Sequence, residues 1–174
     1  IDGADVILVD AGTIDLGAST VTGTYNLTAD GSVTGSGALA ITGVTTIDAS
    51  SGNVTLNTTT NNFQGAVEID GVNVVVVDAG AIDLGASTVT GTYAVTATAD
   101  GNITDSGVLA ITGATTFTAA NGQSIYLDSA NTFSNTVAFS SGGTLANVTI
   151  SDSNNFDLAA LTLSGNLNAT STGG

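Results

Sequence analysis

Residues 1–25 read IDGADVILVDAGTIDLGASTVTGTY, and residues 69–93 read IDGVNVVVVDAGAIDLGASTVTGTY. Twenty of these 25 positions are identical at an offset of 68 residues. The match resumes at an offset of 70, where residues 30–43 correspond to 100–113, and a weaker third copy begins near Asn147. A repeat of roughly 70 residues therefore decides the fold, because neighbouring repeats stack to bury a common core.

A shorter period lies inside the long one. A β-branched aliphatic residue follows a small polar residue at seven places, with 20–29 residues between successive places. The seven aliphatic residues are Val6, Val33, Val54, Val74, Ile103, Ile125 and Val148. Short alternating segments such as Ile14-Asp15-Leu16 fill the intervals and favour strands with one buried face. The spacing indicates about three coils per long repeat, each coil holding three short strands.

These periods predict an all-β chain wound as a right-handed parallel β-helix (β-solenoid) of about seven coils. The handedness rests on the usual right-handed crossover between parallel strands. We expect the seven aliphatic residues to form one core ladder. We expect Asn53, Asn73, Asn102 and Asn147, which precede four of them, to form a turn ladder whose side-chain amides bond the next coil. An antiparallel sandwich is the alternative, but it needs neither period.

The repeat boundaries divide the chain into units 1–68, 69–142 and 143–174, the last of them partial. We expect the three units to form one continuous solenoid. Neither end carries a recognisable capping signal. We therefore expect each end to be covered by adjacent coils of a longer chain, or by identical subunits stacked end to end.

The composition excludes several classes of function. The 174 residues include no Lys, Arg, His or Cys, and 15 acidic groups give a formal net charge of −15. Without Cys or His there is no thiol nucleophile and no ordinary zinc site. Without Lys or Arg, nucleic-acid binding is not expected. No apolar run approaches the ~20 residues of a membrane-spanning helix, so no membrane insertion is expected.

Two segments resemble a known family. Residues 36–69, SGALAITGVTTIDASSGNVTLNTTTNNFQGAVEI, and residues 106–139, SGVLAITGATTFTAANGQSIYLDSANTFSNTVAF, are similar to repeats of very large secreted bacterial exoproteins of the filamentous-haemagglutinin type. The resemblance implies a right-handed β-helical shaft, exported by a two-partner route and serving adhesion, aggregation or matrix building. It also implies an extracellular or cell-surface location.

The acidic residues are the first candidates for a site. Asp10, Asp78 and Asp152 are equivalent in the repeat, and so are Asp15, Asp83 and Asp157. Equivalent residues would lie three coils apart, about 14 Å at the strand spacing, which is too far for one calcium ion to bridge. We therefore interpret these residues as solvated surface charge. No cofactor is expected, although loose surface binding of Ca²⁺ between neighbouring rods stays open.

Three other functions have candidate residues. A polysaccharide-degrading enzyme needs two facing carboxylates, for which Asp10 and Asp15, or Asp78 and Asp83, are the candidates within one coil. Ice binding needs a flat threonine array, but the outward row is interrupted; it reads Ile7, Thr34, Thr55, Val75, Thr104, Tyr126, Thr149. Carbohydrate binding has only Tyr126 as an outward aromatic residue. We therefore expect a non-catalytic structural fibre, with laterally packed fibres or surface glycans as further partners.

Overall fold

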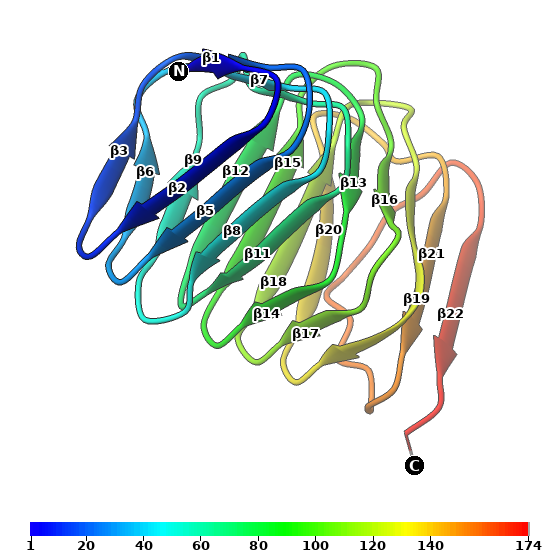
Figure 1. Cartoon of the computed structure of the whole chain (residues 1–174). Helices are drawn as coiled ribbons and strands as arrows, with labels where there is room; N and C mark the ends of the chain where they lie inside the picture. The colour runs from blue at the N-terminus through cyan, green and yellow to red at the C-terminus, as the bar shows by residue number, and fades with distance from the viewer. Residues whose placement is uncertain (174) are drawn as a thin grey trace.

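The computed structural model describes residues 1–173, and all regular secondary structure in that part of the chain is β-strand. The strands wind into a solenoid of about 8 turns (Figure 1). Along most of the rod each strand pairs in parallel with the strand that comes three positions later in the chain. The predicted parallel β-solenoid is confirmed, and the expected seven coils become about eight.

Each turn has three faces, which the chain visits in a fixed order. The first face starts with a four-stranded sheet of β1 (Asp2–Gly3), β4 (Ser19–Val21), β7 (Leu39–Ile41) and β10 (Asn62–Phe63). The third face is a seven-stranded sheet of β3 (Ile14–Leu16), β6 (Val33–Gly35), β9 (Val54–Leu56), β12 (Val74–Asp78), β15 (Tyr93–Ala97), β18 (Thr115–Ala119) and β20 (Val137–Ser141).

An eleven-stranded sheet forms the second face and, beyond β10, takes over the first face as well. Its strands are β2 (Val6–Asp10), β5 (Tyr25–Ala29), β8 (Thr45–Ala49), β11 (Val67–Gly71), β13 (Ile82–Leu84), β14 (Ser87–Val89), β16 (Ile103–Asp105), β17 (Leu109–Ile111), β19 (Ile125–Phe133), β21 (Val148–Asp152) and β22 (Leu167–Ser171). The long strand β19 pairs with both β16 and β17, so it spans two faces in one run.

One continuous core runs along the axis of the rod. Alternate side chains of each strand point inward; in β12, Val74 and Val76 are fully buried while Val75 and Val77 are partly exposed. Aromatic side chains cluster in the core of the second half of the chain. The ring of Phe117 meets Tyr93 and Phe133 edge-on and stacks on Phe139.

The long repeat does not equal a whole number of turns. Val6 starts β2 on the second face, but its equivalent Val74 starts β12 on the third face, ten strands later. Val148, the next equivalent, starts β21 and pairs with Ile125 of β19 on the first face. Ten strands at three per turn make three and one third turns. The prediction of three coils per repeat is therefore too low by one third of a turn. As a result, each repeat begins one face further round the rod.

Candidate functional site

The structure distributes the predicted core ladder over three stacks. All seven aliphatic residues are buried. Val33, Val54 and Val74 pair directly on the third face, and Ile103, Ile125 and Val148 pair directly on the first. Val6 pairs with Tyr25 instead. The single ladder is thus corrected to two ladders of three residues each, with Val6 outside both, because the repeat advances by a third of a turn.

The predicted turn ladder is divided in the same way, between two corners of the rod. At one corner Asn53 Oδ1 accepts the backbone N–H of Asn73 at 3.1 Å, and Asn73 Oδ1 accepts that of Thr92 at 3.0 Å. At the other corner Asn102 Oδ1 accepts the N–H of Ser124, and Asn147 Oδ1 accepts that of Asn166, both at 2.9 Å. The side-chain amides therefore bond the next coil, in two separate rows.

A glycine of the next coil lies against several of these side chains. A Cβ placed on Gly91 would lie well under 3.0 Å from Asn73 Oδ1, and one on Gly165 would lie as close to Asn147 Oδ1. Gly23 lies under Asp5 in the same manner. At these corners an Asn or Asp in one coil is paired with a glycine in the next, whereas Asn53 and Asn102 face Val72 and Gln123 at the corresponding position.

The interpretation of the repeated acidic residues as solvated surface charge is wrong for two of the six, because Asp78 and Asp152 are buried. Asp105, an acidic residue outside that set, is buried as well. The two oxygens of Asp78 accept the N–H of Phe63 at 2.7 Å and of Gly80 at 2.6 Å. Desolvation raises the pKa of Asp78, and these hydrogen bonds oppose the rise. A carboxylate is buried there because it pairs backbone N–H groups that the corner would otherwise leave without a partner.

A second buried carboxylate anchors an irregular segment of β19. Asp105 Oδ1 accepts the N–H of Asp128 at 3.0 Å, and Asp105 Oδ2 accepts Asn131 Nδ2 at 2.6 Å. Asn131 Oδ1 in turn accepts the N–H of Leu109 at 2.8 Å. The register of β19 against β21 shifts between Leu127 and Asn131, where this network lies. Desolvation raises the pKa of Asp105.

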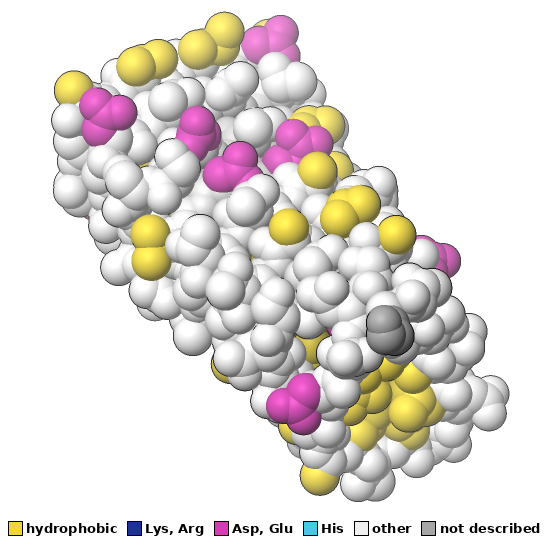
Figure 2. All heavy atoms as spheres, turned by 90° about the horizontal axis from the view of Figure 1, so that it is seen from below, with side chains coloured by type: hydrophobic (Ala, Val, Ile, Leu, Met, Phe, Trp, Pro, Cys, Tyr) yellow, Lys and Arg dark blue, Asp and Glu magenta, His cyan; other side chains and the backbone are white. Residues whose placement is uncertain are grey.

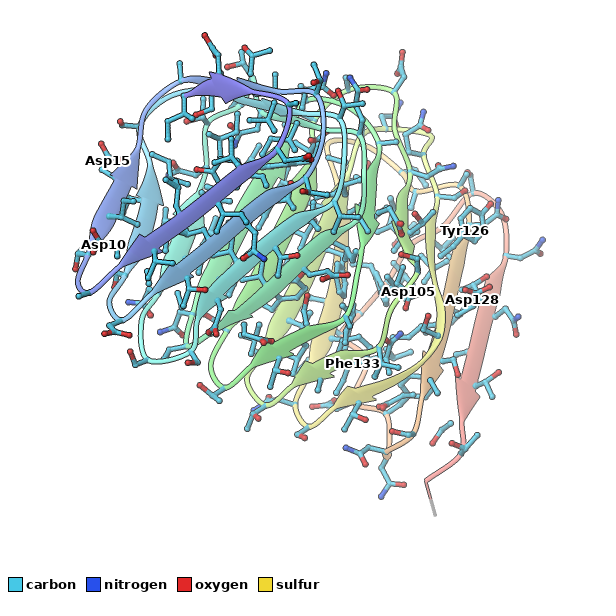
Figure 3. The ribbon with its side chains drawn as sticks, viewed as in Figure 1. Asp10, Asp15, Asp105, Tyr126, Asp128 and Phe133 are labelled. Atoms are coloured by element: carbon cyan, nitrogen blue, oxygen red, sulfur yellow. The ribbon has the colours of Figure 1, made fainter. Side chains whose placement is uncertain are left out.

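Sequence reasoning missed the Asp105–Asn131 network. The available signal was that Asp105 stands where the first repeat has Gly35. Gly35 packs against the side chain of Leu56, whereas Asp105 fills the corresponding interior position with a polar group. Figure 3 shows Asp105 on the same side of the rod as Asp128 and Tyr126, toward the C-terminal half.

The carboxylates considered as an enzymatic pair face different partners. Asp10 turns into its own corner and accepts the N–H of Gly12 at 2.7 Å. Asp15 faces the next coil, where Ser36 Oγ donates to it at 2.6 Å and Thr34 Oγ1 at 3.0 Å. These hydroxyls, Ser36 first, lower the pKa of Asp15. Both residues lie on the first coil (Figure 3), and each is engaged in joining the backbone or the coils.

The outward threonine row is divided like the ladders. Thr34, Thr55 and Val75 are neighbours on the third face, while Thr104, Tyr126 and Thr149 are neighbours on the first. Tyr126 is 36% exposed. Figure 2 shows carboxylates distributed along the face that it presents, with no basic side chain among them.

A depression in the surface lies near the junction of the first two repeats. It has a volume of about 350 Å³. Its lining comes from four turns and consists of Phe63, Gln64, Ala81, Ile82, Asp83, Asp100, Gly101, Asn102, Thr104 and Gln123. We call it the junction groove. It contains Asp83 and Asn102, two candidates from the sequence, and two glutamines that no sequence pattern singled out.

Among residues 1–173, no three His, Cys, Asp or Glu side chains are grouped so as to hold a metal ion. No helix in this part of the chain has the length and apolarity that crossing a membrane would require.

Comparison with known proteins gives a family but no characterised relative. No curated protein and no solved structure matches the chain significantly. The family model described as "Repeats of unknown function (DUF5649)" matches three times, over residues 3–70, 71–140 and 145–174. These matches cover nearly the whole chain and follow the long repeat. The chain therefore belongs to the DUF5649 family of repeats of unknown function.

Proposed function

We propose that this chain is a stretch of extracellular shaft, structural and non-catalytic, in a bacterial surface adhesin or matrix protein. The observation that carries the proposal is the continuity of the rod across the repeat boundaries. Strand β12 of the second repeat pairs with β9 of the first through Val74 and Val54, and its interior joins the same core. A fold whose coils continue across the repeat boundary transmits load along its axis and gains length simply by adding repeats.

The arrangement of the polar groups supports the same reading. Asp78 and Asp105 are occupied with backbone N–H groups, and Asp15 and Asp83 with hydroxyls of the next coil. The hydrogen bonds of these carboxylates join coils to one another. The resemblance of residues 36–69 and 106–139 to secreted exoprotein repeats supports the extracellular location and the adhesive or matrix role.

In this proposal the partners of the chain are adjacent coils of the same longer polypeptide. The chain mass of the native material, measured on a denaturing gel with mass spectrometry, tests this. A mass of hundreds of kilodaltons supports a long shaft. A mass near the 16.8 kDa of this chain overturns it in favour of a subunit that polymerises end to end.

Rod growth by repeat addition has a direct test. A second copy of residues 71–144 is inserted after Thr144, where Leu145 occupies the position equivalent to Gly71 and the repeat begins again. Three and one third turns at the spacing of adjacent strands predict a rod longer by about 16 Å with an unchanged cross-section. Small-angle X-ray scattering measures both dimensions, and a wider particle of unchanged length would overturn the shaft.

The location is tested by antibody labelling of intact producing cells. Labelling of intact cells supports an extracellular role. Labelling that appears only after permeabilisation contradicts it.

A further inference from the structure

The junction groove occupies a break in the first face. The four-stranded sheet ends at β10, and the next strand on this face, β13, pairs with β11 and β16 instead. Phe63 lies at the end of β10 and Ile82 at the start of β13, and both line the groove. The hollow therefore forms because the backbone ladder is interrupted at this point.

The groove follows the axis of the rod across four successive turns. Gln64, Asp83, Asn102 and Gln123 each come from a different turn. Four turns span three strand spacings, about 14 Å. This length suits an extended ligand lying along the axis. It does not suit a single cation, whose oxygen ligands must all lie about 2.3–2.6 Å from one point.

Unused polar side chains converge on this groove. The side chains of Gln64, Asp100 and Gln123 enter none of the hydrogen bonds found within residues 1–173. Gln64 and Gln123 are the only glutamines of the chain, although they lie far apart in sequence. The second repeat has Ser134 where the first has Gln64, so this combination is particular to the groove and is not a general feature of the repeat.

The chemistry of the lining selects the ligand. Asp83 and Asp100 accept hydrogen bonds and repel anions, while the amides of Gln64, Asn102 and Gln123 both donate and accept. The apolar side chains of the lining add a small hydrophobic area. A volume of about 350 Å³ falls within the range of small-molecule sites. A chain of neutral hydroxylated rings matches the length, the hydrogen-bonding groups and the charge.

We propose that the junction groove binds a linear neutral oligosaccharide, with its hydroxyl groups bonded to Asp100 and the glutamine amides. This site goes beyond the shaft function proposed above. It makes the rod a carbohydrate-contacting surface as well as a spacer.

The test is a two-dimensional NMR titration of the isotope-labelled chain with cellotriose, maltotriose and chitotriose. We expect at least one of these trisaccharides to shift amide signals of residues 81–82 and 101–102. The double variant Gln64→Ala/Gln123→Ala should weaken that binding at least about tenfold, which corresponds to about 1.4 kcal/mol. Asp100→Ala should weaken it as well. Its repeat equivalent Asp30→Ala lies outside the groove and should leave binding unchanged.

Three results overturn the proposal. One is the absence of localised shifts with all three trisaccharides at millimolar concentration. Another is equal weakening by Asp30→Ala and Asp100→Ala. The third is that CaCl₂ moves the same signals and prevents saccharide binding by occupying the groove. Signal dispersion of each variant reports whether it is folded. Since rod length is measured without any sugar, failure of the groove leaves the shaft proposal to its own test.

Discussion

At the scale of single residues, the close approach of two turns at Asn73 depends on Gly91 in the next turn. Asn73 Oδ1 accepts both the backbone N–H and the hydroxyl of Thr92, and Gly91 leaves room for that oxygen. The pair involves two coils, because the Asn belongs to one turn and the Gly to the next. A side chain on the glycine has to displace either the amide or the backbone of Val72.

Gly91→Ala is therefore expected to destabilise the rod by about 1–3 kcal/mol, the usual range for overpacking a tight site. The added Cβ meets Asn73 Oδ1 and lies 2.7 Å from the carbonyl oxygen of Val72. The free energy of unfolding in urea is the measurement. Gly17→Ala is the matched control, since a Cβ there meets nothing within 4 Å. Equal effects of the two substitutions would contradict the role of close approach.

Asn131 is the residue on which the interior polar network depends. Asn131→Ala leaves the carboxylate of Asp105 and the N–H of Leu109 without their buried partner. Each unpaired buried group costs about 1–3 kcal/mol, so we expect a loss of about 3 kcal/mol or more. Asn26→Ala, on the exposed side of β5, should stay within about 0.5 kcal/mol of the parent chain. Urea unfolding measures the two free energies of unfolding. Equal losses for Asn131→Ala and Asn26→Ala would contradict a special role of the network.

At the scale of the strands, the sequence predicts where the strands lie but not which face of the rod each strand occupies. The alternation in Ile14-Asp15-Leu16 and the seven β-branched residues locate real strands and real core positions. The stacking of those residues depends on the number of strands per repeat. That number is ten, and it is hidden by β19, which runs through two faces in one strand. Short apolar runs do not encode which neighbour they pair with.

The burial of the carboxylates is hidden from the sequence for a related reason. Asp78 and Asp152 are the last residues of β12 and β21, and the tripeptides that they begin, Asp-Ala-Gly and Asp-Ser-Asn, also suit an exposed turn. Their burial depends on the preceding coil, which supplies the N–H of Phe63 or Phe133. The junction groove likewise arises from residues on four turns. The register in which the strands pair decides which residues of neighbouring coils touch. Because the sequence alone does not give that register, it does not predict these contacts.

The buried carboxylates make the stability of the rod depend on pH. Desolvation raises the pKa of Asp78 and Asp105 above the ordinary value of 3.8, so the folded chain binds protons that the unfolded chain releases. Stability from these groups is therefore greatest at low pH and is lost as the pH rises through their folded-state pKa values. The pKa values of Asp5 and Asp15 are lowered, so those groups lose their contribution only as the pH falls below about 3.8. We expect the free energy of unfolding to increase as the pH falls from 7 toward the pI of about 4.1.

Asp105→Asn should make the free energy of unfolding depend less on pH, because the substituted amide does not titrate. This expectation concerns the slope and not the stability at a single pH. Asp48→Asn removes the same charge from the outward side of β8 and provides the control. Urea unfolding of the three proteins at several pH values gives the slopes. A slope for Asp105→Asn equal to that of Asp48→Asn would assign the pH dependence to general charge repulsion.

At the scale of the whole molecule, the repeat and the charge act together. Each repeat starts one face further round, so a rod continued with the same repeat returns to its starting face after three repeats and ten turns. Features carried once per repeat are thus presented in three directions, while the junction groove, which depends on Gln64 and Gln123, faces only one. In a shaft of this kind, contacts made by repeated surface residues are available all around the rod.

The charge itself gives the last prediction. With 15 acidic groups and no basic side chain, every interaction between side-chain charges is repulsive, and salt screens such repulsion. We expect the rod to gain about 1 kcal/mol between low salt and molar NaCl, which raises the thermal midpoint by about 2–4 °C for a chain of this size. Circular dichroism melts measure this rise, and a midpoint that falls with NaCl would contradict the repulsion.

Divalent salts at equal ionic strength separate this screening from specific binding. Equal midpoints in MgCl₂ and CaCl₂ are expected, since no three acidic side chains of residues 1–173 are grouped around one point. Screening depends on ionic strength and not on the identity of the cation, whereas a calcium site needs six to eight oxygen ligands around one ion. A much larger rise with Ca²⁺ than with Mg²⁺ would therefore reveal a calcium site that joins coils or neighbouring rods, and the charge would then act as a crosslinking surface and not only as a source of repulsion.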